Sequence, residues 1–169
     1  MTTASEPTAT GEGSTLAGRY RLESFVGQGG MSFVYAATDE HANERVAIKV
    51  LRPKYLDHAE MVERFLREAR AAARVPHPNI VEIRDYGIAS DGQVFTAMEF
   101  LLGESLASTL AREGALPWNR VRHLGLQLCA AAGAAHRAGV VHRDISLGNA
   151  FRIQRGADRD FVKLVDFGL

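Results

Sequence analysis

The chain has 169 residues, of which 46% are hydrophobic and 24% charged, a composition typical of one globular domain or one domain and a tail. Lysine and arginine together number 20, as do aspartate and glutamate, so the formal net charge is +0, which argues against nucleic acid as the main partner. The single cysteine, Cys129, excludes an internal disulfide and favours a reducing compartment. We expect Cys129 to be a small core residue on a helix.

No stretch of the sequence approaches the ~20 apolar residues that span a bilayer. The N-terminus also lacks the basic and then apolar pattern of a secretion signal. We therefore expect a cytoplasmic location with no membrane contact in this segment. Residues 1–16 are rich in Thr, Ser, Gly and Glu, and they are predicted to be a disordered tail because they bury too little apolar surface to offset their ordering entropy.

From Tyr20 onward the chain is first rich in predicted strands and then in predicted helices. Strands are expected where β-branched and aromatic residues cluster, and helices where Ala, Leu, Glu and Arg recur at helical spacing. The expected strands are 20–26, 33–38, 45–51, 81–88 and 93–100, followed by a short pair near the C-terminus; the expected helices are 57–74, 105–113 and 117–138, with Pro117 in a first turn. This order favours an α+β architecture with a sheet lobe followed by a helical lobe.

A glycine cluster, Gly27–Gly30, lies between the first two predicted strands. Glycines allow a backbone to pass close to a ligand, and the N–H groups of such a loop can point at phosphate oxygens. A dinucleotide fold needs a helix directly after the glycines, whereas here the strand-like FVYAAT follows. What remains is a glycine-rich hairpin, which is either a phosphate-binding loop or an ordinary turn.

Two charged residues occupy otherwise apolar elements. In the strand Val46–Val50, alternation places Ala47 and Lys49 on one face, and Lys49 is either solvated there or directed at an anion. Glu68 falls at the centre of the apolar face of the 57–74 helix. A buried carboxylate needs a cation, so Glu68 either pairs with Lys49, or extends to an edge of the face, or pairs with Arg64 on its own helix.

Two further motifs place oxygen ligands on loops. In His142-Arg143-Asp144 with Asn149, the aspartate is able to orient a hydroxyl and accept its proton, and the asparagine oxygen suits Mg²⁺. Asp166-Phe167-Gly168 follows an apolar strand, where a carboxylate suits metal coordination. Each motif alone is equally typical of a capped turn.

Taken together and in this order, the glycine hairpin, the VAIK strand, Glu68, the HRD loop with its asparagine and the DFG triplet resemble the eukaryotic-like protein kinase family. Arg67-Glu68-Ala69 and His77-Pro78-Asn79 also resemble that family, and in particular its bacterial Ser/Thr kinases. The resemblance runs from about Tyr20 to Leu169. It implies a protein-kinase-like bilobal fold, with a complete β-rich N-lobe at 17–101 and a truncated helical C-lobe at 102–169 that carries helices D and E, the catalytic loop and DFG.

The resemblance also implies a protein serine/threonine kinase that transfers the γ-phosphoryl group of ATP, with Mg²⁺, to a protein hydroxyl. Asp144 would orient that hydroxyl, Lys49 would hold the α- and β-phosphates and pair with Glu68, and Asn149 and Asp166 would hold the metal. His142, Phe167 and Ala72 would form the hydrophobic spine that aligns the lobes. The residues implied at the nucleotide are Val26, Gly27, Gly29, Gly30, Val34, Ala47, Lys49, Met98 as gatekeeper, Glu99 and Leu101 at the hinge, and Phe151 under the adenine.

The sequence departs from the family at several positions. Ser32 replaces the third glycine of the loop, Ser146 replaces the usual lysine after the HRD aspartate, and Leu147 replaces a proline. The loss of the lysine predicts retained ATP binding with reduced turnover, so a pseudokinase or nucleotide-binding regulatory module is the alternative function. A small-molecule phosphotransferase of the aminoglycoside-kinase type is a more distant one.

The chain ends directly after DFG. We expect a fragment of a longer kinase whose isolated helical lobe leaves apolar surface on 121–138 without a partner, and whose full-length form is able to dimerise.

Overall fold

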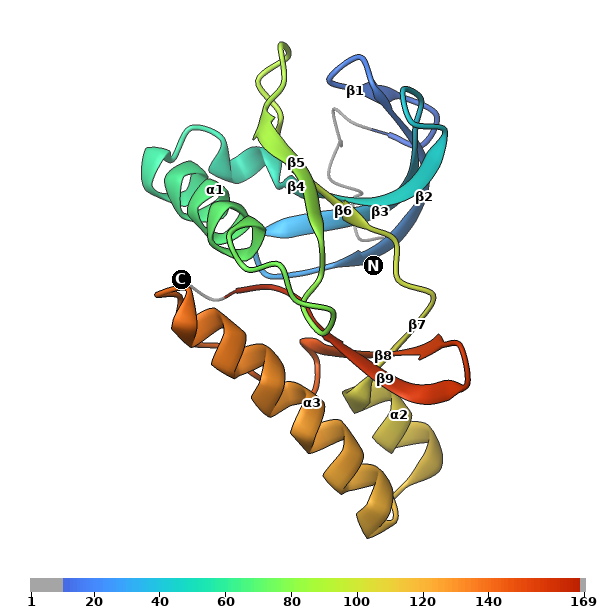
Figure 1. Ribbon diagram of the computed structural model, residues 1–169. Helices are drawn as coiled ribbons and strands as arrows, with labels where there is room; N and C mark the ends of the chain where they lie inside the picture. The colour runs from blue at the N-terminus through green and yellow to red at the C-terminus, as the bar shows by residue number, and fades with distance from the viewer. Residues whose placement is uncertain (1–10, 168–169) are drawn as a thin grey trace, which may run out of the picture. The chain divides into compact units, whose positions relative to one another are not determined.

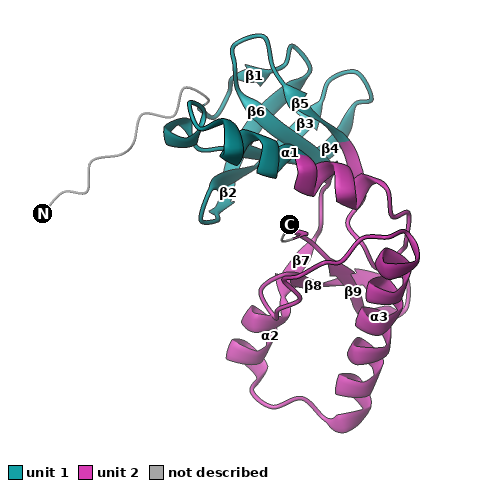
Figure 2. Cartoon of the chain, turned by 90° about the vertical axis from the view of Figure 1, so that its left-hand side faces the viewer, with its two compact units in different colours: residues 1–66, 85–98 teal, residues 67–84, 99–169 magenta. Residues whose placement is uncertain are grey.

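The computed structural model describes residues 11–167 of the chain (Figure 1). The chain divides into two compact units, residues 1–66 with 85–98 and residues 67–84 with 99–169 (Figure 2). The division falls inside one helix and directly after Met98. The end of the helix and the segment that follows it belong to the second unit.

The first unit is built on a curled sheet with the strand order β1-β2-β3-β4-β6-β5. The β1–β2, β2–β3 and β3–β4 pairs are antiparallel. Two irregularities in the β2–β3 register bend the sheet, one between Leu22 and Ser24 and one between Phe25 and Gly27. The strands are β1 (Thr15–Leu16), β2 (Tyr20–Gln28), β3 (Ser32–Asp39), β4 (Glu44–Leu51), β5 (Ile83–Ile88) and β6 (Val94–Glu99).

The alternation predicted for β4 is confirmed. Val46, Ile48 and Val50 are buried in the core of the first unit, whereas Ala47 and Lys49 are only half-buried on the opposite face. Lys49 lies opposite Val34 in the β3–β4 register, so these residues share a face of the sheet. The core of this unit is completed by buried residues from the other strands: Leu16, Tyr20, Leu22, Phe33, Tyr35, Ala37, Ala89, Phe95 and Ala97.

Part of the predicted N-terminal tail is ordered. We expected disorder over 1–16; residues 1–10 lie outside the described part of the chain, but the prediction is wrong for 11–16. Leu16 is completely buried in the sheet core, and Thr15 and Leu16 pair with Arg21 and Tyr20. The polar composition of the segment conceals this one anchor, whose burial offsets the cost of ordering its neighbours.

An ion pair closes the base of this sheet. Arg19 donates to both carboxylate oxygens of Asp39, at 2.9 Å and 2.7 Å, and this contact holds the pKa of Asp39 down at about 2. Tyr20 donates its hydroxyl to Asp85 at 2.9 Å. Burial is the main reason why the pKa of Tyr20 lies above its ordinary value, and the bond to Asp85 adds to it. The bond from Tyr20 to Asp85 joins β5 to the N-terminal half of the sheet.

Helix α1 (Ala59–Ala73) follows β4 after a 3-10 turn, η1 (Pro53–Tyr55). Phe65 packs with Leu51 and Val94 in a small cluster within the first unit. Further along the helix, Ala71 and Ala72 belong to the core of the second unit. Glu68 lies between Phe65 and Ala71 along the helix and is half-buried.

The second unit combines a three-stranded sheet with two helices. The sheet is antiparallel in the order β7-β8-β9, from β7 (Gly103–Ser105), β8 (Ala150–Arg155) and β9 (Asp158–Leu164). Helix α2 (Leu106–Glu113) is capped by Ser105, whose Oγ accepts from the Ser108 N–H at 3.1 Å. Helix α3 (Trp118–Arg137) packs along β9 (Figure 1). The buried residues that hold these parts together are Ala71, Ala72, Val75, Ile80, Leu106, Leu124, Ala131, Ala135, Val140, Ala150, Val162, Leu164 and Phe167.

Two details of α3 differ from the predictions. Pro117 is the N-cap rather than a first-turn residue. Cys129 is exposed rather than part of the core, because the buried stripe of the helix runs through Leu124, Ala131 and Ala135, and Cys129 lies on the other side. Val121 and Leu126 on the same helix are also largely exposed, as predicted for this helix. Within 11–167, no helix is long and apolar enough to cross a membrane.

Candidate functional site

The HRD loop of the second unit brings two predicted catalytic residues into contact. The Asn149 side-chain Nδ2 donates to the Asp144 carboxylate Oδ2 at 2.8 Å and to the Asp144 carbonyl at 3.0 Å. The Asn149 N–H in turn donates to Ser146, to its carbonyl at 3.2 Å and to its Oγ at 3.3 Å. The loop thus fixes the carboxylate of Asp144 in one direction, with the amide oxygen of Asn149 turned away from that contact.

A buried aromatic contact connects this loop to the DFG segment. The rings of His142 and Phe167 have centroids 4.4 Å apart, and their exposed fractions are 2% and 1%. The pKa of His142 is lowered, mainly by burial. The Val165 backbone and the carboxylates of Asp144 and Asp166 act in the opposite direction but do not outweigh burial. His142 is therefore neutral near pH 7, and its Nδ1 accepts the Asp144 N–H at 3.3 Å. Ala72, the third predicted spine residue, lies in the same core as Phe167.

Two motif residues have backbones in the left-handed region. Arg143 has a φ of 63° and Asp166 a φ of 54°, a conformation that residues with a side chain rarely adopt and that structures retain mainly at functional sites. The surrounding backbone holds this geometry: the Val165 N–H donates to the Asn149 carbonyl at 2.9 Å, and the Leu164 N–H to the Asn79 carbonyl at 2.8 Å. Ala17 and Asn43, in turns of the first unit, are the other two non-glycine residues with a positive φ in the described part of the chain. Two of these four positions thus lie in the loops predicted to carry the chemistry.

The donors in these loops fit a magnesium ion. Asn149 offers an amide oxygen and Asp166 a carboxylate, both hard ligands of the kind Mg²⁺ prefers. In the part of the chain that the structure describes, no cluster of three or more His, Cys, Asp or Glu side chains is arranged to hold a metal. Mg²⁺ at phosphate-transfer sites commonly uses one or two protein oxygens together with phosphates and waters, so the donor chemistry of Asn149 and Asp166 is compatible with this ion.

The predicted phosphate loop is a hairpin in the first unit, between β2 and β3. Gly27 pairs with Val34, and the Gly29 N–H donates to the Ser32 carbonyl at 2.9 Å, which closes the tip. Val26 precedes the tip and is 56% exposed. Ser32, the residue in place of the third family glycine, is 2% exposed and is part of the closed turn.

Lys49 lies on the same sheet, and its Nζ is 5.8 Å from the centre of the Phe65 ring of α1. The side chain is therefore directed toward the helix that also carries Glu68, one turn beyond Phe65. Ala47 and Val34, the predicted adenine contacts of this unit, share its face of the sheet. Met98, the predicted gatekeeper, is buried at the end of β6.

The remaining nucleotide residues belong to the second unit. Glu99 accepts the Glu82 N–H at 2.8 Å and pairs with Lys163 of β9, a contact the sequence analysis did not anticipate. Its side chain is thus occupied, and its predicted role requires its backbone. Leu101 is half-buried. Phe151 is half-buried on β8 and lies opposite Ser105 and Lys163 in the sheet register.

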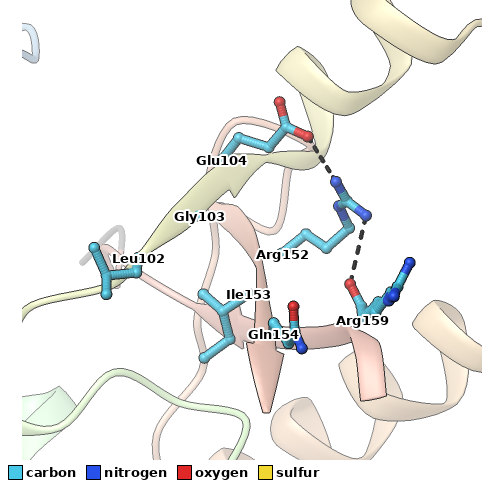
Figure 3. Close-up of a pocket in the computed structure, with 7 residues that line it drawn as sticks. All are labelled: Leu102, Gly103, Glu104, Arg152, Ile153, Gln154 and Arg159. Carbon is cyan, nitrogen blue, oxygen red and sulfur yellow. Dashed lines mark hydrogen bonds and ion pairs between the residues drawn. The ribbon is translucent and has the colours of Figure 1, made fainter. Parts of the chain in front are cut away.

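Sequence reasoning also missed an ion-pair network beneath β7 and β8. Arg152 donates to Glu104 at 2.8 Å and, more weakly, to the Arg159 carbonyl at 3.4 Å, along one wall of a pocket (Figure 3). Arg112 also binds Glu104, and these two arginines hold the pKa of Glu104 down at about 2. Arg120 extends the network to Asp160 at 2.7 Å. Arg152 and Asp160 lie on the two strands of one hairpin, β8 and β9. Opposite charges on the strands of a hairpin are too common for the sequence to indicate this network.

Comparison with known proteins places this geometry in a family. The protein kinase domain family matches residues 20–169. The serine/threonine-protein kinase pkn3 of Myxococcus xanthus is 42% identical over 157 residues, which are 93% of this chain and 29% of that protein. PknA of Mycobacterium tuberculosis is 40% identical over 161 residues, which are 93% of this chain and 36% of that protein.

Solved structures of kinases are also similar to this chain. A crystal structure of the Mycobacterium tuberculosis PknI kinase domain has a TM-score of 0.79 at 33% identity and covers 95% of this chain and 62% of its own. A structure of Rad53 in complex with AMP-PNP has a TM-score of 0.73 at 26% identity, and covers 89% of this chain and 38% of its own.

The sheet unit with its glycine hairpin, and the helical unit with its HRD and DFG loops, define a protein kinase fold. The chain belongs to the protein kinase domain family, and its relatives among the bacteria are serine/threonine-protein kinases. The chain spans about a quarter to a third of the length of these curated relatives. The predicted family and the α+β fold, with a β-rich first part and few helices after it, are confirmed.

Proposed function

We propose that this chain is part of the catalytic region of a protein serine/threonine kinase that transfers the γ-phosphoryl group of ATP to a protein hydroxyl. Residues 17–101 would be its N-lobe and residues 102–169 part of its C-lobe. The observation that carries the proposal is the contact of Asn149 with Asp144 at 2.8 Å. It supports the proposal because a carboxylate able to accept a proton and an amide able to offer an oxygen to a metal lie on one loop, the combination that phosphoryl transfer requires.

Each predicted residue has a task in this reaction. Asp144 orients the substrate hydroxyl and takes its proton, while neutral His142 fixes the Asp144 backbone by accepting its N–H. Lys49 neutralises the α- and β-phosphates and Glu68 braces Lys49. Asn149 and Asp166 would hold Mg²⁺, which when bound neutralises charge on the phosphates. Gly27, Gly29 and Gly30 would cover the phosphates, and the adenine would lie among Val26, Val34, Ala47, Met98, the backbones of Glu99 and Leu101, and Phe151.

Membership of this family also supports a proposal for the compartment and the partners of the reaction. We place the domain in the cytoplasm, where ATP and Mg²⁺ are supplied, and expect its partner to be a protein with an accessible serine or threonine. A kinase dimer in the full-length protein is a further expectation. The AMP-PNP bound to Rad53 supports ATP as the nucleotide.

The test is transfer of labelled phosphate from ATP to a generic protein substrate by the full-length protein, with Asp144→Asn as the matched control. We expect transfer by the natural protein and a loss of about a hundredfold or more in the variant. Equal labelling by both proteins would refute the assignment of Asp144. Tight ATP binding without transfer by either protein would support the alternative, a pseudokinase that holds nucleotide without turnover.

A further inference from the structure

Arg52, the residue directly after β4, contacts the tip of the glycine hairpin at several points. Its guanidinium donates to the Gly29 carbonyl at 2.7 Å and to the Gln28 Oε1 at 3.2 Å. The same group lies over the Phe33 ring, 4.8 Å from its centre, within the range of a cation–π contact. The Arg52 N–H also donates to the Met31 carbonyl at 3.0 Å. One residue thus touches both arms of the hairpin and its turn, all within the first unit.

The chain holds Arg52 in place for this contact. Pro53 follows it, which restricts Arg52 to an extended backbone, and the observed angles are φ −64° and ψ 142°. The Arg52 Nε is buried and has no hydrogen-bond partner among the described residues. A buried donor without an acceptor is costly. The position of the guanidinium is therefore set by its contacts with the hairpin, and not by a need to satisfy every donor.

We propose that Arg52 is a positioning residue for the nucleotide, and that it keeps the glycine hairpin in the conformation that binds phosphates. The inference rests on the proposed kinase function. A carbonyl oxygen directed at a phosphate would repel it, and Arg52 binds the Gly29 carbonyl so that this oxygen is not available to face an anion. Binding to a loop that is already ordered also avoids the entropy cost of ordering it.

The shape of the arginine side chain matters as much as its charge. A guanidinium presents a planar fork that is able to bind two acceptors while it stacks on a ring, whereas the ammonium of lysine is a point charge on a flexible stem. The Nη2 of Arg52 donates to both the Gly29 carbonyl and the Gln28 side chain while the guanidinium lies over the Phe33 ring. Lysine at this position is thus expected to keep the charge and lose most of the positioning.

The experiment compares the natural protein with Arg52→Ala, Arg52→Lys and a control, Arg45→Ala. Arg45 lies on β4, near the strand's start, with a side chain that is 53% exposed and that pairs with Glu23, away from the hairpin tip. Three quantities are measured in the full chain: amide hydrogen exchange over residues 28–33 without ligand, the dissociation constant for ATP, and the split between KM for ATP and kcat.

We expect Arg52→Ala to speed exchange at the hairpin tip and to weaken ATP binding about fivefold to tenfold, through KM with kcat little changed. For Arg52→Lys, both the exchange rate and the ATP affinity should lie between those of the natural protein and of Arg52→Ala. Arg45→Ala should match the natural protein in both. If Arg52→Ala fails to fold, as judged by its melting curve, Arg52→Lys carries the test.

ATP affinity and exchange that stay unchanged in both Arg52 variants would overturn the inference. A uniform increase in exchange over the whole first unit would overturn it as well, because it would show a general loss of stability. A natural protein that binds no ATP would refute the proposed function and with it the nucleotide role of Arg52, whereas the exchange rates of the ligand-free chain would still decide whether Arg52 orders the hairpin.

Discussion

The Asn149 side chain donates to the Asp144 carboxylate at 2.8 Å, so one residue proposed to hold the metal also fixes the direction of the proposed base. Asn149→Asp turns this hydrogen bond into a contact of two carboxylates, which raises the pKa of one of them. We expect kcat to fall about a hundredfold or more and the acidic limb of the pH–rate profile to move to higher pH.

Asn149→Ala is the matched control for that variant. It removes the donor without adding a charge, so kcat should fall while the acidic limb stays where it is in the natural protein. Steady-state kinetics across the pH range measure both properties. An Asn149→Asp profile with an unmoved acidic limb would show that the two side chains do not interact during turnover.

The buried contact of His142 with Phe167 predicts a pH-dependent stability. Because burial lowers the pKa of His142, the unfolded chain takes up protons first as the pH falls. Its contribution to stability is therefore complete above the ordinary value of 6.5 and is lost as the pH falls through the lowered value in the folded state. Thermal melts should show this loss in the natural protein.

His142→Phe separates this effect from other titrations. The phenyl ring keeps the packing against Phe167 but does not titrate, so the melting temperature should fall less between about pH 7 and pH 5 than in the natural protein. The pKa of His77 is also lowered, mainly by burial, and it remains in both proteins, so the difference between them isolates His142. Parallel melting curves would contradict the assignment of a buried neutral imidazole.

The sequence alone could predict features that depend on local spacing, but not features that depend on contacts between distant parts of the chain. Alternation placed Lys49 on the half-buried face of β4, because a period of two leaves few choices. The sequence pattern could not show that residues 11–16 are ordered, because their ordering depends on the burial of a single leucine, Leu16, among polar residues. The ion-pair network around Arg152 joins residues from β7, α2, β8 and β9, and such contacts depend on the fold rather than on local spacing.

Gly103 is a position where the backbone tolerates only glycine. A Cβ built there would lie 2.0 Å from the Arg152 carbonyl oxygen, which belongs to the backbone of the paired strand. Gly103→Ala must therefore push β7 away from β8, at a cost of about 2 kcal/mol or more. Urea unfolding should show a lower midpoint, whereas Gly125→Ala, at a glycine of α3 with open space around its Cβ position, should be neutral or slightly stabilising. Equal midpoints for the two variants would mean that the strands separate without cost.

Ser146 occupies the position at which related Ser/Thr kinases carry a lysine, and here its carbonyl and hydroxyl accept the Asn149 N–H. Ser146→Lys adds a cation near the proposed γ-phosphate site and leaves the Ser146 carbonyl contact to the backbone. Preorganised charge of this kind stabilises the transition state, so we expect the rate of phosphorylation by the full-length protein to rise about tenfold. Ser146→Met adds a side chain of comparable bulk without charge and should give no rise. A lysine variant no faster than the methionine variant would show that the missing cation does not limit turnover.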